Sequence, residues 1–473
     1  MIGPVRPSAR SSQQRAGAVV TLVSALGAAQ SVAIVTQIGG TGDAVGGSIF
    51  GAGPTAQIVL GLLSTVFLAV AITVTSVVVT GSAEVVLTGQ VRDIALRRLL
   101  GSPASAEQSR ATRAILRHAV TGMAWGTVAG YAVSLVVLSA GLSASGQLHV
   151  TAGTLVPSPL VIIGLAAQLI ATRGAVRRGM RGVVNVQPIE ALRRSADADT
   201  AVTATLAVAS LWAKAALWGG VTVLGLAVLV STRSPFAMLP AVTGGVLSFI
   251  GLVSHGDRFV PRLLDGVSRA LPRTLGVTFA RRSLLRHPAR TSRAVLAVSA
   301  TVTLVATFSV GIASFERAVQ EHYDGSAVQG LAADVLSAVV SVVVVLTGFL
   351  ALTAAIALGN AVSFSARLRR RDIALLRVLG QSERHSRAGI LAQSLLLSLT
   401  AAVLGLGLGT IYGWIGAQSV FGVKAPGHVV TPVLPRPLLA GTAAATGLLT
   451  LAASLAPIRA SLRQPPIRAF LTP

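Results

Sequence analysis

The chain has 473 residues, of which 52% are hydrophobic and only 11% charged, and its mean hydropathy is +0.75. Soluble domains carry about a quarter charged residues, so this composition excludes an ordinary soluble globular protein. The net charge of +24 comes with only 4% aromatic residues and no cysteine, which argues against a nucleic-acid partner and excludes disulfides and cysteine-based metal sites.

Long apolar runs recur along the whole chain. A membrane-spanning helix needs roughly 20 apolar residues. Ten runs approach or exceed this length, and in chain order the expected spans are 17–38, 55–82, 115–142, 156–173, 206–231, 235–254, 294–314, 334–363, 388–417 and 437–457. The sequence therefore predicts an all-α polytopic membrane protein with about ten transmembrane helices.

The basic residues predict the orientation of these spans. Loops on the cytoplasmic side of a membrane accumulate Lys and Arg. With the N-terminus inside, the opposite side would hold only Arg233, Arg317, Lys424 and Arg436. We therefore expect a bacterial inner (plasma) membrane protein with both termini in the cytoplasm. The first run resembles a signal peptide, but it continues through SVAIVTQ, so we expect it to be retained as a span.

One decamer occurs twice. Residues 92–101 read RDIALRRLLG and residues 371–380 read RDIALLRVLG, with eight of ten positions identical at an offset of 279 residues. Each copy follows a long span, precedes two more, and is followed by a Pro-Ile-x-Ala signal, in QPIEALRRS and PPIRAFLTP. Internal duplication is typical of pseudo-twofold transporters. The sequence predicts a first unit at 1–198, two linking spans at 199–256 and a second unit at 257–473.

Each decamer is predicted to form a short helix that ends at its glycine. On such a helix Leu375 and Leu379 share one face, whereas Arg377 points nearly opposite. The first copy repeats this arrangement with Leu96, Leu100 and Arg98. An apolar ridge flanked by charges suits a soluble partner, with anionic lipid headgroups as the alternative. The repetition of the same residues at the same topological place favours the protein partner.

The segment RRRDIALLRVLGQSERHSRAGILAQSLLLSLTAAVLGLGLG resembles the signature of the FtsX-like permease family, the MacB/LolC-type membrane subunits of ABC transporters. ARRSLLRHPARTSRAVLAVSATVTL is similar to the start of such a permease unit, and QPIEALRRS to its end. The resemblance covers both four-span units. The layout of four, two and four spans is similar to the Bce-type permeases of antimicrobial-peptide transporters.

The resemblance implies that each decamer, near 90–101 and 369–380, is a coupling helix for an ABC ATP-binding subunit, which would bind in two copies. The residues assigned to this contact are Arg92, Asp93, Leu96, Arg98, Gly101, Arg371, Asp372, Leu375, Arg377, Leu379 and Gly380. ATP and Mg²⁺ would be bound by that partner, because the chain has no Gly-x-x-x-x-Gly-Lys-Ser/Thr loop, and we expect no catalytic residue or cofactor here. The implied function is export or membrane extraction of a peptide antibiotic, lipid or lipopeptide.

The sequence also departs from this family. GGTGDAVGGSIFGAGPTA and FERAVQEHYDGSAVQGLAAD are too short for the usual extracytoplasmic domain, so a separate extracytoplasmic binding protein stays open as a partner. In the first copy AVTGMAWGTVAG replaces SLTAAVLGLGLG, and we expect its gap after the decamer glycine to be four residues longer and the two ATPase sites to be unequal. The glycines in these runs are expected to permit close helix packing rather than to bind phosphate.

Two alternative functions remain open at this stage. An ion-coupled secondary transporter usually places an acidic residue or a histidine in the middle of the membrane. None of the fifteen acidic residues clearly lies in the middle of a predicted span, which disfavours this class. The other alternative is an FtsX-type signalling subunit that transmits a conformational change without moving cargo. Stimulation of the ATPase by substrate would distinguish transport from signalling.

Overall fold

The computed structural model describes most of the chain. The described residues are 8–46, 68–80, 97, 100–145, 159–184, 206–231, 233, 237–272, 274–286, 288–322, 347–359, 361–363, 383–421 and 430–462. Their regular secondary structure is entirely helical. The chain divides into two compact units, unit 1 with residues 1–209 and 329–353 and unit 2 with residues 210–328 and 354–473. The predicted domain boundaries remain predictions.

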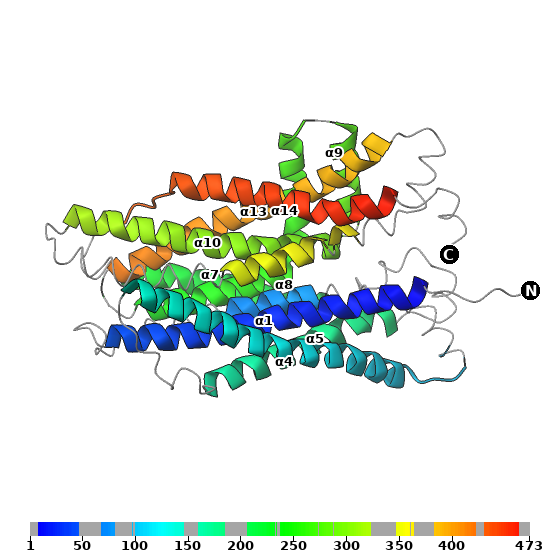
Figure 1. The fold of residues 1–473 in the computed structure, drawn as a ribbon. Helices are drawn as coiled ribbons and strands as arrows, with labels where there is room; N and C mark the ends of the chain where they lie inside the picture. The colour runs from blue at the N-terminus through cyan, green and yellow to red at the C-terminus, as the bar shows by residue number, and fades with distance from the viewer. Residues whose placement is uncertain are drawn as a thin grey trace, which may run out of the picture. The chain divides into compact units, whose positions relative to one another are not determined.

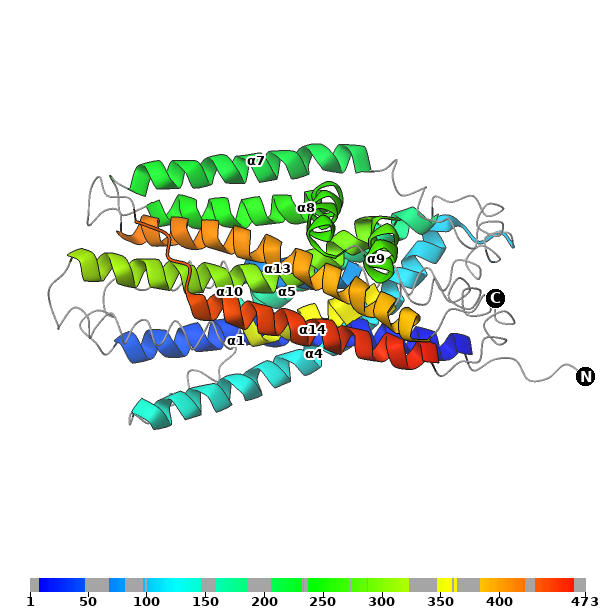
Figure 2. The same cartoon turned by 90° about the horizontal axis from the view of Figure 1, so that it is seen from above.

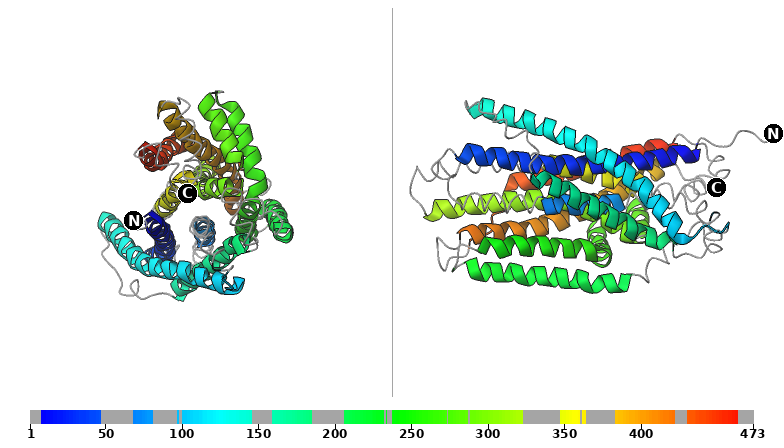
Figure 3. Two further views of the ribbon diagram at one scale, coloured as in Figure 1. Left: turned by 90° about the vertical axis from the view of Figure 1, so that its right-hand side faces the viewer. Right: turned by 90° about the horizontal axis from the view of Figure 1, so that it is seen from below.

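Unit 1 is built on two long helices that cross each other. Helix α1 (Ser8–Gly46) packs most extensively against α4 (Ala104–Ser145), as the right-hand view of Figure 3 shows, and α5 (Pro159–Val184) contacts both. A shorter apolar helix, Leu68–Thr80, approaches α1 where Thr75 lies beside Gly27. Gln168 of α5 donates a hydrogen bond of 3.1 Å to the Ser24 carbonyl of α1. Apolar contacts and a buried polar contact therefore hold this unit together.

Unit 2 is centred on a second pair of long helices. Helix α10 (Pro288–His322) runs beside α13 (Glu383–Phe421), and these two make the most extensive contact of the unit (Figures 1 and 2). Around them pack α8 (Met238–Ala270), α9 (Leu275–Arg286) and α14 (Arg436–Leu462), and α7 (Leu206–Ser231) lies against α8.

Six helices are long and apolar enough to cross a membrane: Gly17–Thr36, Ser105–Val136, Leu211–Ser231, Met238–Ala270, Thr291–Ala318 and Arg387–Ser419. Three shorter apolar helices cover Leu68–Thr80, Val161–Gly174 and Thr347–Ser363. Large side chains such as Trp125, Ile170 and Trp212 are at least 72% exposed, which suits a lipid-facing surface. The chain is thus a multi-pass membrane protein. Each of the ten predicted spans contains helical residues, and their number as crossings stays a prediction.

Glycines allow the main helix pair of each unit to approach closely. On α4, a Cβ atom at Gly122, Gly126 or Gly130 would collide with the backbone of α1. On α13, Gly405, Gly409 and Gly413 face α10 in the same way. Small residues four apart on one helix face let two backbones pack within van der Waals contact. The expectation that these glycine runs serve helix packing is therefore confirmed.

The spacing of these glycines corrects one expectation. Gly126 lies 25 residues beyond Gly101, and Gly405 lies 25 residues beyond Gly380. The gap after the decamer glycine is therefore equal in the two copies when measured to a glycine of close helix approach. Our expectation of a gap four residues longer in the first copy is wrong, because it compared sequence letters rather than the positions where the helices meet.

Helix α8 continues far beyond the predicted span end at residue 254. The chain becomes strongly charged from Asp257 onward, yet the helix runs to Ala270 and is followed by α9. Val260 and Leu264 of this extension are fully buried, and they pack in one core with Ala280 and Leu284 of α9. A buried apolar stripe thus holds a helical hairpin together although its other side is basic.

Candidate functional site

The end of the first decamer has the predicted geometry. Gly101 has a φ of 95°, a left-handed conformation that glycine adopts without steric cost. The backbone N–H of Ser102 donates to the carbonyl of Arg97 at 3.0 Å. This bond spans six residues and is the hydrogen bond of a Schellman motif, which closes a helix at its C-terminus. The prediction that this helix ends at Gly101 is confirmed.

The last leucine of the first decamer is open to its surroundings. Leu100 is 88% exposed, directly before the terminating glycine. Such exposure leaves an apolar side chain available to a partner, although single exposed leucines are common. The other predicted contact residues, Arg92, Asp93, Leu96, Arg98, Arg371, Asp372, Leu375, Arg377, Leu379 and Gly380, lie outside the described residues. Their role as an ATPase contact therefore stays a prediction.

A buried carboxylate joins the end of this decamer to α4. Glu107 is only 2% exposed and accepts hydrogen bonds from Arg97 at 3.3 Å, Arg110 at 3.0 Å and the Ser102 hydroxyl at 3.0 Å. These three donors compensate a negative charge that would be costly to bury alone. Sequence reasoning missed Glu107. Its only local signal was an Arg three residues later, which is common on helix surfaces.

A second charged cluster stabilises the α8–α9 hairpin of unit 2. Asp265 of α8 pairs with Arg269 on the same helix and with Arg281 of α9, whose Nε donates at 2.7 Å. Helix α9 in turn lies along the first turns of α13, where Gly276 approaches Ala388. Helix α13 begins at Glu383, three residues after the second decamer ends. The hairpin therefore supports the helix that directly follows the second decamer.

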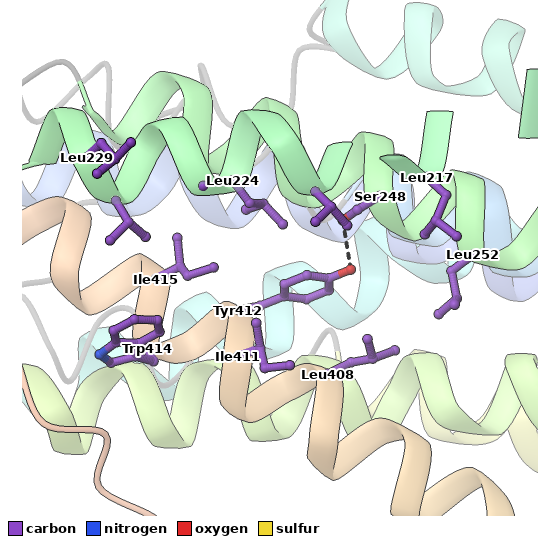
Figure 4. Close-up of a pocket in the computed structure, with 13 residues that line it drawn as sticks. Leu217, Leu224, Leu229, Ser248, Leu252, Leu408, Ile411, Tyr412, Trp414 and Ile415 are labelled. Atoms are coloured by element: carbon purple, nitrogen blue, oxygen red, sulfur yellow. Dashed lines mark hydrogen bonds between the residues drawn. The ribbon is translucent and has the colours of Figure 1, made fainter. Parts of the chain in front are cut away.

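Unit 2 also contains an apolar pocket between α7, α8 and α13. Figure 4 shows Leu217 and Leu224 of α7, Leu252 of α8 and Ile411 of α13 on its walls, and its volume is about 470 Å³. The lining is almost wholly apolar. The hydroxyls of Ser248 and Tyr412 meet there at 2.8 Å, as the dashed line marks. An apolar cavity with one hydroxyl pair suits a hydrocarbon chain that carries a polar group.

Sequence reasoning did not find this pocket. Its residues lie on three helices, and nothing in a leucine-rich span distinguishes a pocket wall from a packed face. Gly225 lines the pocket, and a Cβ atom there would meet nothing within 4 Å. A glycine that no neighbour requires is the single sequence feature that marks the place, and it is recognisable only once the packing is known.

Residues 344–466 match the family described as FtsX-like permease C-terminal. The matched range contains the second decamer, α13 and α14, and it covers less than half of the chain. No curated protein matches the chain. The C-terminal part of this membrane protein therefore resembles the permease subunits of ABC transporters, in agreement with the family resemblance found in the sequence.

Proposed function

We propose that the chain is the permease subunit of an ABC transporter, in which a separate ATP-binding subunit drives movement of an amphipathic or lipophilic substrate. The observation that carries this proposal is the match of residues 344–466 to FtsX-like permeases. Permeases of this family typically work with ATP-binding subunits. The chain has no nucleotide-binding loop of the Walker type in its sequence, so the partner would supply ATP hydrolysis.

The helix positions support a duplicated permease body. Helix α4 begins at Ala104 and α13 at Glu383, which reproduces the offset of 279 residues between the decamers. The apolar helices that begin at Leu68 and Thr347 are separated by the same offset. Each unit pairs its main helices through glycines at Gly126 or Gly405. Two copies of one helix arrangement would present two coupling helices, one for each ATP-binding subunit.

The distribution of charge supports a cytoplasmic position for both decamers. In unit 2, the α8–α9 hairpin and the start of α13 lie at one end of the helices, and this end is rich in arginine. Basic residues gather on the cytoplasmic side of inner-membrane proteins. We infer that the hairpin, both decamers and both termini face the cytoplasm, where an ATP-binding subunit can reach them.

The first test is identification of the ATP-binding subunit. The tagged chain is purified from native membranes in mild detergent, and the proteins that accompany it are identified by mass spectrometry. Leu375→Asp with Leu379→Asp replaces the apolar ridge of the second decamer by charge and should reduce recovery of the ATP-binding subunit. Thr431→Asp with Leu434→Asp is the matched control, because it adds the same charge at exposed positions outside both decamers.

Loss of the ATP-binding subunit in the decamer variant and not in the control would support the proposal. A folded, abundant chain that brings no ATP-binding subunit in any form would reject it and favour ion-coupled transport. An ATP-binding subunit whose activity does not respond to any amphipathic peptide or lipid would favour the signalling alternative.

We further propose that the α7–α8–α13 pocket takes the hydrocarbon part of the substrate. The pocket lies within helices apolar enough to cross the membrane, so lipid chains can enter it from the bilayer. The Ser248–Tyr412 hydroxyl pair offers one polar contact at a defined depth. These features match a molecule with a long apolar part and a nearby polar group.

This pocket can be closed without disturbing the packing. Gly225→Phe places a ring in the pocket, whereas Gly407→Phe on α13 is the control, because its Cβ also meets nothing within 4 Å and it does not line the pocket. The probe is a phosphatidylcholine with a photoreactive diazirine on its acyl chain, reconstituted with the purified chain. Cross-links should concentrate on α7, α8 and α13 and fall several-fold only in Gly225→Phe. Labelling spread evenly over all helices, unchanged by Gly225→Phe, would reject the pocket as a binding site.

A further inference from the structure

The Glu107 cluster joins an element of the decamer to an element of the membrane body. Arg97 belongs to the decamer, Glu107 and Arg110 to the first turns of α4, and Ser102 to the short connection between them. Glu107 touches all three, at 3.3 Å, 3.0 Å and 3.0 Å. The backbone of the connection is fixed as well, because the N–H groups of Ala106 and Glu107 both donate to the Pro103 carbonyl.

This cluster cannot form in the second copy. At the offset of 279 residues, the positions of Arg97, Ser102, Glu107 and Arg110 are occupied by Leu376, Gln381, Ser386 and Gly389. None of these four side chains carries a charge, so no ion pair can link the second decamer to α13 at these positions. Eight of the ten decamer residues are nevertheless identical, and Arg97 is one of the two that differ.

The burial of Glu107 gives the difference mechanical weight. A carboxylate that is 2% exposed cannot exchange its arginine partner for water without leaving a buried unpaired charge. Movement of the decamer away from α4 is therefore strongly opposed. Helix α4 in turn meets α1 through Gly122 and Gly126 at backbone contact. A displacement of the first decamer would pass to α4 and then to α1 with little slack.

We propose that Glu107 is a positioning residue that locks the first decamer onto α4, and that the second decamer operates without this lock. In combination with the proposed function, on which this consequence rests, the two ATPase contacts are unequal. The first contact is rigidly joined to the membrane helices, and the second transmits force through other contacts. Glu107 itself need not touch the ATP-binding subunit.

The lock can be tested without any partner. The chain has no cysteine, so a single nitroxide label can be placed by Leu100→Cys, at a side chain that is 88% exposed. In the purified full chain in lipid nanodiscs, Glu107→Gln should shorten the rotational correlation time of this label several-fold. The matched control places the label by Leu379→Cys in the second copy, where Ser386→Gln should leave the spectrum unchanged.

Charge exchange separates the lock from a general effect on folding. Arg97→Glu alone should release the label, and Arg97→Glu together with Glu107→Arg should restore most of the restriction. If Glu107→Gln does not fold, Arg97→Gln replaces it, because Glu107 then keeps Arg110 and Ser102 as partners. A label at position 100 whose motion is the same in Arg97→Gln and in the unchanged protein would overturn the proposal.

A second arm tests the inequality of the two contacts. Cross-linking of the purified ATP-binding subunit is compared at Leu100→Cys and at Leu379→Cys, each with and without Arg97→Gln. Arg97→Gln should lower the yield several-fold at position 100 and leave position 379 unchanged, and equal losses at both positions would overturn the inequality. If no ATP-binding subunit binds at either position, the proposed function fails, while the spectra still decide whether Glu107 holds the decamer.

Discussion

The α1–α4 contact of unit 1 and the α10–α13 contact of unit 2 reach the same close packing by different means. A Cβ atom at Gly126 would meet the carbonyl oxygen, carbonyl carbon and Cα of Ala25, all backbone atoms. A Cβ atom at Gly409 would first meet the Cβ of Ala306, a side-chain atom. Unit 1 therefore has no side chain to trim if its glycine is enlarged, whereas unit 2 does. One sequence pattern thus hides two degrees of tolerance.

The charged ends of the two units differ more than their spans do. In unit 1 a fully buried carboxylate, Glu107, ties the decamer to α4. In unit 2 the corresponding positions are uncharged, and the carboxylate of Asp265 instead joins α8 to α9, with 21% of its side chain exposed. The two units share the packing of their apolar helices, and they diverge where a soluble partner would be contacted.

The largest effect should follow from Gly126→Leu. Four added carbon atoms cannot enter the backbone contact with Ala25, so α1 and α4 must separate and lose their packing. We expect little folded protein, measured as the monodisperse fraction by size-exclusion chromatography after detergent extraction. Gly407→Leu is the control, since its Cβ meets nothing within 4 Å. Equal recovery of both variants would show that the glycine contact does not hold unit 1 together.

A smaller loss that can be repaired is expected from Gly409→Ala. The new methyl group collides with Ala306, which should cost about 1–3 kcal/mol of stability. Adding Ala306→Gly should restore part of the thermal midpoint in detergent, because it removes the colliding atom. In unit 1, Ala25→Gly should not repair Gly126→Ala, since the collision there is with backbone. Repair in both units, or in neither, would contradict the difference described above.

A moderate effect is expected from Asp265→Asn. The asparagine keeps the shape but loses both ion pairs, to Arg269 and Arg281, and partly exposed pairs contribute about 1 kcal/mol or less. We expect a modest fall in thermal midpoint and faster proteolysis in the α8–α9 connection near Leu271. Glu316→Gln removes an exposed carboxylate of α10 and serves as control. Identical proteolysis of the two variants would show that Asp265 does not hold the hairpin closed.

The smallest effects concern hydrogen bonds between spans. Thr36 and Ser134 join α1 to α4 at 2.7 Å, and Ser398 and Thr450 join α13 to α14 at 2.6 Å. Such bonds average about 0.6 kcal/mol in membrane proteins. Thr36→Val and Thr450→Val should each lower the thermal midpoint by only a degree or two, on the order of that energy. A loss as large as that of Gly409→Ala would mean that polar contacts dominate the assembly.

The sequence predicts those features that depend on local patterns. Apolar runs marked the spans, and the decamer glycine marked the helix end found at Gly101. The continuation of α8 to Ala270 was missed because its buried stripe of Val260 and Leu264 is interrupted by charged residues in the sequence. Glu107 and the pocket were missed because each depends on side chains from separate elements, and their meeting is decided by tertiary packing.

The central claim is that each decamer is a separate docking point for one ATP-binding subunit. Native mass spectrometry of the purified complex, with Leu96→Asp and Leu100→Asp in the first decamer or Leu375→Asp and Leu379→Asp in the second, tests it most directly. We predict two ATP-binding subunits for each unchanged chain, one when either decamer is altered, and none when both are. A complex that keeps both subunits with both decamers altered, or a folded chain that never binds one, would contradict the account.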